Sequence, residues 1–169
     1  NLSSHKRGWD ERWEEFSMLA EKGQNYIIKL NELVDKDTDA FNQILNSFRL
    51  SEKTEKEKNI KKESIQKATL NAIEIPLKIM RLSLELMDLI KTLAQKGNPN
   101  SVSDVGVAAL CARSAVLGAH LNVIINAKDY SDKKSGNALL KEAERIKTKA
   151  IKQEKSILDI TLTIINNST

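Results

Sequence analysis

Asp37 is the residue best placed to do chemistry, because a carboxylate interrupts an apolar repeat at that point. It falls between Val34 and Phe41, whereas Asp39 lies on the other side of the same turn and is expected to be solvated. A carboxylate that faces a core is costly unless it is paired, and burial favours its neutral form. Asp37 is therefore expected either to form a salt bridge, for example with Arg113, or to act as a general acid or base.

A second group of polar residues lies in the stretch 97–129, whose small side chains leave room for a neighbouring backbone or a ligand. Asn98, Asn100, Ser101 and Asp104 lie just before or at the start of an expected helix, where the first backbone N–H groups have no acceptor within the helix. Others recur at helical spacing on the side that carries Asp104, and buried amides there need partners, either a ligand or another helix. Arg113 lies roughly opposite and is expected to pair with Asp37 or to bind a substrate carboxylate. The polar candidates are Asn98, Asn100, Ser101, Asp104, Asn122 and Asn126.

Several other kinds of site find no support in the sequence. Neither His5 nor His120 belongs to a Glu-x-x-His pair, so we expect no metal site. A net charge of +4 and 4% aromatic residues are too little to indicate nucleic-acid binding. The single cysteine, Cys111, excludes a disulfide framework, and no uninterrupted apolar stretch of about 18 residues occurs. We expect a soluble, cytoplasmic protein with no nucleic-acid or membrane partner.

Hydrophobic periodicity predicts an all-α fold of about four long helices. The 169 residues include only 6 Gly and 2 Pro, so few positions interrupt a helix. Pro76 is expected to kink the second helix, Gly97 to end it, and Ser103 or Asp104 to cap the third. Short connections favour antiparallel neighbours, so residues 1–169 are expected to form a single up-and-down bundle. The helices are expected at about Trp9–Phe48, Lys58–Lys96, Ser103–Lys128 and Gly136–Ile165.

Two of these helices carry long apolar surfaces. The first has one apolar seam, close to a heptad repeat. The second has two stripes, displaced by roughly 140° around the axis, so it needs a further partner, either another subunit or a helix outside this chain. We therefore expect a homodimer. The seam consists of Ile27, Leu30, Val34, Phe41, Leu45 and Phe48, and the stripes consist of Leu70, Ile73, Leu77, Met80, Leu84 and Met87 and of Ile75, Ile79, Leu82, Leu86, Leu89 and Leu93.

Four segments in the same order resemble one enzyme family. They are NLSSHKRGWDERWEEF at the start, LVDKDTDAFN (33–42), AIEIPL (72–77) and GNPNSVSDVGVAALCARSAVLGAHLNVIINAKD (97–129). Together they are similar to the formiminotetrahydrofolate cyclodeaminase family, the helical C-terminal domain of formiminotransferase-cyclodeaminase, which is related to methenyltetrahydrofolate cyclohydrolases. The family's N-terminal helix, with its Pro-Gly-Gly-Gly-Ser loop, would precede Asn1. The resemblance therefore implies an N-terminally truncated cyclodeaminase-like domain, which alone can be inactive.

The resemblance implies conversion of 5-formiminotetrahydrofolate to 5,10-methenyltetrahydrofolate and ammonia, in histidine degradation and one-carbon metabolism. This ring closure uses no metal or redox cofactor beyond the folate substrate. The implied partners are a folate with or without a polyglutamate tail, a fused or associated formiminotransferase domain, and a second copy in a homodimer or higher oligomer. Two other functions stay open: a methenyltetrahydrofolate cyclohydrolase, and a non-catalytic dimerising bundle. The expected catalytic residues are Asp37 and Asp104, and the expected substrate-binding residues are Asn98, Asn100, Ser101, Arg113, Asn122 and Asn126.

Overall fold

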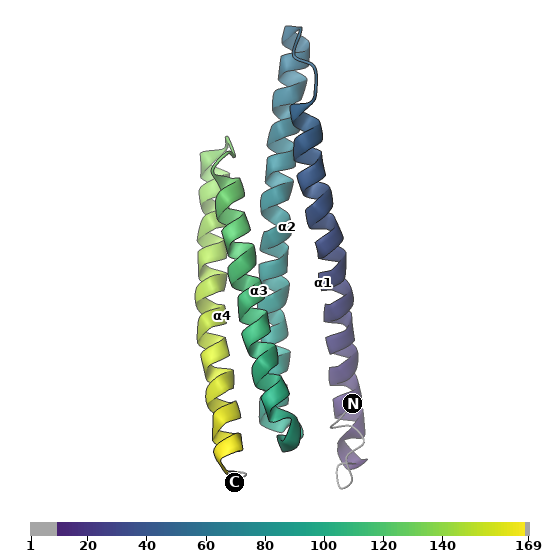
Figure 1. Ribbon diagram of the computed structural model, residues 1–169, viewed down its shortest axis with the longest axis vertical. Coiled ribbons are helices and arrows are strands. Elements are labelled where there is room, and N and C mark those ends of the chain that lie inside the picture. Colours follow the sequence, from purple (N-terminus) through teal and green to yellow (C-terminus); the bar gives the residue numbers. More distant parts are fainter. Residues whose placement is uncertain (1–9, 168–169) are drawn as a thin grey trace.

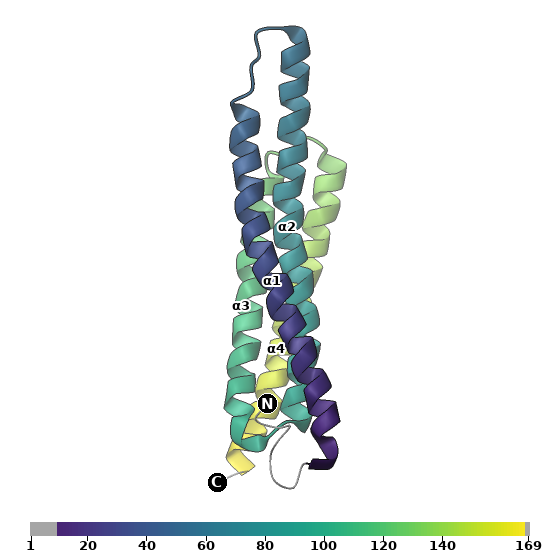
Figure 2. The ribbon, with the colours of Figure 1, turned by 90° about the vertical axis from the view of Figure 1, so that its right-hand side faces the viewer.

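The computed structural model describes residues 10–167, which form four long antiparallel helices (Figure 1). Helix α2 lies in the middle, with α1 on one side of it and α3 and α4 on the other, and the α1–α2 hairpin extends beyond the α3–α4 end (Figures 1 and 2). The predicted all-α bundle is confirmed. Its elements are the 3₁₀ turn η1 (Asp10–Arg12), α1 (Trp13–Phe48), α2 (Glu55–Lys96), the 3₁₀ turn η2 (Pro99–Ser101), α3 (Val102–Ala127) and α4 (Lys133–Asn167). The expected start at Trp9 lies outside the described residues.

Local hydrogen bonds determine where α2 begins and ends. The Thr54 hydroxyl accepts a hydrogen bond from the Glu57 backbone N–H at 3.2 Å, and the Glu57 carboxylate accepts one from the Thr54 N–H at 3.0 Å. This reciprocal capping box starts the helix at Glu55, three residues before the predicted start. At the other end the Gly97 N–H donates to the Leu93 carbonyl at 2.8 Å. A Cβ at Gly97 would lie 2.5 Å from that oxygen, which explains the glycine.

The main core lies between α2, α3 and α4, and α1 is attached to α2 through a smaller cluster. Fully buried side chains in the main core include Ile73, Leu77, Met80, Met87, Val116, Val123 and Ile157. The smaller cluster contains Leu33 and Ala40 of α1, packed against Ala72 and Ile75 of α2. The second apolar stripe of α2 therefore faces α1, within the same chain. The two apolar stripes of α2 therefore no longer indicate a second subunit.

The predicted apolar seam of α1 mostly faces outward, contrary to expectation. Val34 is 61% exposed and Phe41 is 60% exposed, whereas Leu33, Ala40 and Ser47 are buried against α2. The small side chains of Ala40 and Ser47 allow the two helices to approach closely, so the neighbouring positions of the repeat pack inward. Periodicity locates an apolar stripe but does not say which of two adjacent stripes faces the core.

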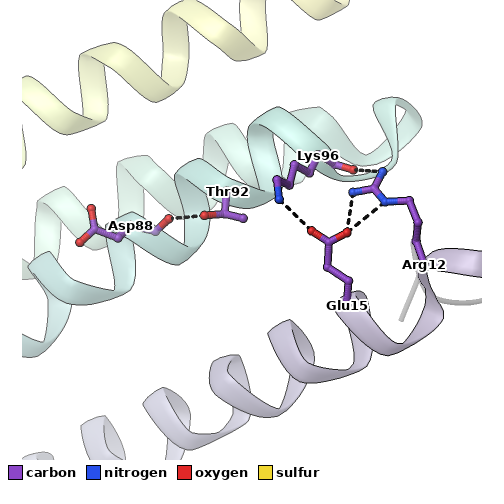
Figure 3. Close-up of polar contacts among 5 residues, drawn as sticks. All are labelled: Arg12, Glu15, Asp88, Thr92 and Lys96. Carbon is purple, nitrogen blue, oxygen red and sulfur yellow. Dashed lines mark hydrogen bonds and ion pairs between the residues drawn. The ribbon is translucent and has the colours of Figure 1, made fainter.

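Charged side chains also link α2 to α1 and to α4. At the base of α1, Glu15 accepts hydrogen bonds from Arg12 at 2.9 and 3.0 Å and from Lys96 of α2 at 2.9 Å (Figure 3). Farther along, Arg81 of α2 donates two hydrogen bonds to Glu142 of α4, at 2.7 and 2.8 Å. These bonds lower the pKa of the Glu142 carboxyl and raise the pKa of Arg81.

Candidate active site in the groove between helices α1 and α3

Two pockets lie along the groove that α1 and α3 form over α2. The first, called here the Asp37 pocket, has a volume of about 210 Å³. It brings Asp37 together with Asn122 and Asn126, as expected for residues of one site, although α1 and α3 are far apart in the sequence. Its lining consists of Asp37, Phe41, Ile44, Ala72, Asn122, Ile125 and Asn126.

Asn126 is held in this pocket by a break in the hydrogen bonding of α2. Pro76 lies inside the helix and has no N–H, so the Ala72 carbonyl four residues earlier lacks its usual helical partner. The Asn126 side-chain amide donates to that carbonyl oxygen at 2.7 Å. One amide hydrogen therefore completes the backbone of α2 and ties α3 to it. The sequence carried the signal, because a proline within a helix leaves a carbonyl that needs a donor.

Asp37 is half-buried, and it makes no hydrogen bond or ion pair with any residue in the described range 10–167. The predicted salt bridge between Asp37 and Arg113 is wrong. Arg113 points to α4, where its Nε lies 3.4 Å from a carboxylate oxygen of Glu154. That contact is a charge pair without good hydrogen-bond geometry. Arg113 therefore neither orients Asp37 nor lines either groove pocket.

The second pocket, called here the Asp104 pocket, lies at the other end of the groove and has a volume of about 350 Å³. Asn98, Ser101 and Asp104 line it together with apolar residues of α1 and α2. The Asn98 carbonyl oxygen of the side chain accepts from the Asn100 N–H at 3.1 Å and so caps η2. Asn100 itself is exposed and does not line the pocket.

The predicted cap of α3 at Ser103 or Asp104 is wrong, and the helix starts one residue earlier than predicted. Ser101 occupies the N-cap position, without a side-chain capping bond, and the helix begins at Val102 rather than at Ser103. Asp104 is therefore an exposed residue of the first turn. The partial positive charge of the helix N-terminus favours a carboxylate there.

The residues predicted to form one site are thus divided between two. Asp104 and Asn122 lie on the same side of α3, but they are separated by about 27 Å at a rise of about 1.5 Å per residue. Within one chain, Asp37 and Asp104 cannot contact the same reacting atom. Among residues 10–167 no three His, Cys, Asp or Glu side chains lie close enough to hold a metal ion.

The stretch Pro99–Ala127 is long and apolar enough to cross a membrane by length and composition alone, with a mean hydropathy of 1.5 over an 18-residue window, although polar residues interrupt it. One such helix is weak evidence for a membrane span, because the core helix of a soluble protein passes the same test. The polar side chains of Arg113, His120, Asn122 and Asn126 lie within it. Its exposed apolar residues nevertheless require an explanation.

The fold and the pocket define an all-α helical bundle with a polar site in the groove between α1 and α3. The family described as formiminotransferase-cyclodeaminase matches residues 1–145, and this chain belongs to it. A methenyltetrahydrofolate cyclohydrolase from Methylorubrum extorquens is 33% identical over 150 residues, which cover 89% of this chain and 72% of that protein. The resemblance to a cyclodeaminase and cyclohydrolase family is thereby confirmed.

Two further comparisons concern the parent proteins and the fold. The formimidoyltransferase-cyclodeaminase of Rattus norvegicus is 33% identical over 126 residues, which cover 75% of this chain but only 22% of that protein. The crystal structure of formiminotetrahydrofolate cyclodeaminase from Thermotoga maritima superposes with a TM-score of 0.84 at 24% identity, covering 98% of this chain and 78% of that one. The second comparison shows that the bundle fold is shared.

Proposed function

We propose that this chain acts on the one-carbon unit of a tetrahydrofolate and closes 5-formiminotetrahydrofolate to 5,10-methenyltetrahydrofolate and ammonia. The observation that carries the proposal is the Asp37 pocket, where one carboxylate meets two side-chain amides from a different helix. Membership of the family supports the substrate class. The similarity to formimidoyltransferase-cyclodeaminases supports the ring closure.

The reaction transfers one proton between two nitrogens. The formimino group reacts in its protonated, amidinium form, so its nitrogen already carries two hydrogens. The anilino nitrogen forms a bond to the formimino carbon and loses its proton, and the formimino nitrogen gains that one further proton before its C–N bond breaks and ammonia leaves. The Asp37 carboxylate accepts the first proton and delivers it to the departing amine, so the enzyme returns to its starting state. Negative charge in the pocket also stabilises the delocalised cation of the product. No step requires a metal or redox cofactor.

The amides of the pocket have separate roles in this proposal. Asn122 is exposed at the mouth and makes no hydrogen bond within the described chain, so both its donor and its acceptor are available to the substrate. Asn126 uses one donor on the Ala72 carbonyl and presents the rest of its amide to the pocket. Two amides with fixed positions suit the pterin ring, whose edge carries alternating donors and acceptors.

A second candidate is hydrolysis of 5,10-methenyltetrahydrofolate, in which water attacks the methenyl carbon. The observation that favours it is the similarity to a methenyltetrahydrofolate cyclohydrolase. The matched residues cover 72% of that enzyme and 89% of this chain. The same carboxylate would then remove a proton from the attacking water. Ammonia distinguishes the two reactions, since only ring closure of the formimino compound releases it.

The test supplies each folate separately and follows ammonia and methenyl absorbance together, with heat-denatured protein as the control. Equal amounts of ammonia and methenyl-folate formed from 5-formiminotetrahydrofolate are the expected result. Consumption of methenyl-folate without any ammonia from the formimino compound would replace the cyclodeaminase by a cyclohydrolase. No turnover of either folate would reject both and leave a non-catalytic bundle. We also propose that the protein functions as a homodimer.

A further inference from the structure

The side-chain amide of Asn126 is held in one orientation in the Asp37 pocket. Its NH₂ group donates to the carbonyl oxygen of the buried Ala72 at 2.7 Å. Turning the amide over would set two acceptor oxygens against each other and would leave that carbonyl without a donor, because Pro76 has no N–H. An unpaired buried carbonyl is costly. The amide nitrogen therefore stays on the Ala72 carbonyl, and the amide oxygen is turned away from it.

The oxygen of this amide is an open acceptor. Among residues 10–167 nothing donates to the Asn126 Oδ1, and the atom is not buried, because the Asn126 side chain is only partly covered. Asn126 lines the Asp37 pocket, so its oxygen is available to a molecule bound there. The fold thus supplies a hydrogen-bond acceptor whose direction is set before any ligand binds.

Asp37 supplies a second acceptor to the same pocket. Its carboxylate comes from α1, and Asn126 comes from α3, two helices that flank α2 (Figure 1). An ionised carboxylate only accepts hydrogen bonds. Asn122 also lines the pocket, but it is exposed and makes no hydrogen bond in the described part of the chain, so its amide is free to turn either way. The two groups with a defined polarity are therefore both acceptors, and they suit a ligand group that carries N–H donors.

The protonated formimino group has these donors, and its oxygen analogue lacks them. Its outer nitrogen carries two N–H bonds, so it can donate to the Asp37 carboxylate and to the Asn126 oxygen together. In 5-formyltetrahydrofolate an oxygen atom, which only accepts, replaces that nitrogen. The methenyl carbon of the second candidate reaction carries no N–H at all. A site built to bond an N–H group discriminates against an analogue that lacks it, because the polar groups of the site are then left unpaired.

We propose that Pro76 is a positioning residue that holds the Asn126 oxygen toward the substrate, and that this oxygen selects folates whose one-carbon group carries an N–H donor. Pro76 is fully buried and does not line the pocket, so it acts on the ligand through Asn126. The interrupted hydrogen bonding of α2 then determines specificity as well as stability. This proposal rests on the proposed function, because it requires the one-carbon group of a folate to lie in the Asp37 pocket.

Calorimetric dissociation constants of 5-formiminotetrahydrofolate and 5-formyltetrahydrofolate test the selection. They are measured in an Asp37→Asn background, which slows turnover and leaves Asn126 as the fixed acceptor. The formimino compound is expected to bind at least about tenfold more tightly, the contribution of one hydrogen bond to a charged group.

Adding Pro76→Ala to this background is expected to reverse part of the preference. The new N–H pairs with the Ala72 carbonyl, so Asn126 is free to turn its NH₂ group toward the formyl oxygen. The formyl compound should then bind about fivefold more tightly, the contribution of one neutral hydrogen bond, and a further Asn126→Leu change should abolish this gain. Pro99→Ala, at an exposed proline outside the pocket, is the matched control and should leave both constants within about twofold.

A measurement without folate separates this proposal from the proposed function. In NMR spectra the side-chain amide protons of Asn126, identified by their loss in Asn126→Leu, should be protected from exchange with solvent in the wild type and should lose that protection in Pro76→Ala. Equal exchange in the two proteins would overturn the fixed orientation. Equal binding of the two folates, or equal weakening of both by Pro76→Ala, would overturn the selection. Absence of ammonia release with the expected exchange and binding intact would reject the proposed function alone.

Discussion

The bond between Asn126 and the Ala72 carbonyl gives a prediction that needs no knowledge of the substrate. Asn126→Leu removes the donor and leaves a buried carbonyl without a partner, since Pro76 cannot supply one. An unpaired buried carbonyl costs about 1–3 kcal/mol, so the free energy of unfolding in urea should fall by about 2 kcal/mol. At about 2–4 °C per kcal/mol for a chain of this length, the melting temperature should fall by about 4–8 °C.

The same substitution made in a Pro76→Ala variant shows whether the unpaired Ala72 carbonyl causes this loss of stability. In Pro76→Ala the new N–H at position 76 donates to Ala72 along the helix, so the same Asn126→Leu change should cost less than about 0.5 kcal/mol there. The coupling free energy of this double-mutant cycle is therefore about 1.5 kcal/mol. Equal costs in the two backgrounds would refute the reasoning, because the loss would then come from packing in the pocket and not from the orphaned carbonyl.

Three further predictions concern stability. Thr54→Ala removes the capping box of α2 and should lower the free energy of unfolding by about 1 kcal/mol in urea titrations; no change would mean that the helix starts elsewhere. Gly106→Val should cost about 1–3 kcal/mol, because a Cβ there already lies 3.1 Å from Thr161, and a neutral result would contradict that contact. Because Arg81 lowers the pKa of Glu142 below its ordinary value of 4.5, the pair stabilises the fold above that pH and the contribution is lost as the pH falls through the lowered pKa. Glu142→Gln should therefore flatten the acid side of the stability curve, and an unchanged curve would argue against the ion pair.

Sequence reasoning predicted the bundle because long periodic segments with few glycines and prolines leave little choice of fold. The family resemblance, and not the residue pattern alone, placed Asp37, Asn122 and Asn126 in one expected site, and the structure brings these three residues to one pocket. The start of α2 at Glu55 was not predicted, but the sequence contains the signal for it, because Thr54 and Glu57 have the spacing of a capping box.

The sequence could not predict which residue pairs with Arg113, nor that the expected site residues lie in two separate pockets. An arginine between two neighbouring helices can turn to either, and only the packed structure places Glu154 beside it. Helical spacing gives the direction of a side chain and not its neighbours, so Asp104 could be assigned to the correct side of α3 but not to the correct pocket. Helix α1 carries apolar residues on both its inward and its outward side. The small Ala40 faces the core because it lets α2 pack closely, and this contact cannot be seen from the sequence of α1 alone.

The most direct test of the central claim is ammonia release from 5-formiminotetrahydrofolate by the wild-type chain, Asp37→Asn and Asp39→Asn, measured side by side. Asp39 is exposed on the same helix, so the control makes the same chemical change outside the pocket. A general acid–base residue contributes about 10²–10⁴-fold, and we predict at least a 100-fold loss of kcat in Asp37→Asn, about 2.7 kcal/mol of transition-state stabilisation, with Asp39→Asn within about twofold of wild type. A loss of less than about threefold in Asp37→Asn, which corresponds to about 0.65 kcal/mol, would contradict the assignment of the chemistry to this pocket.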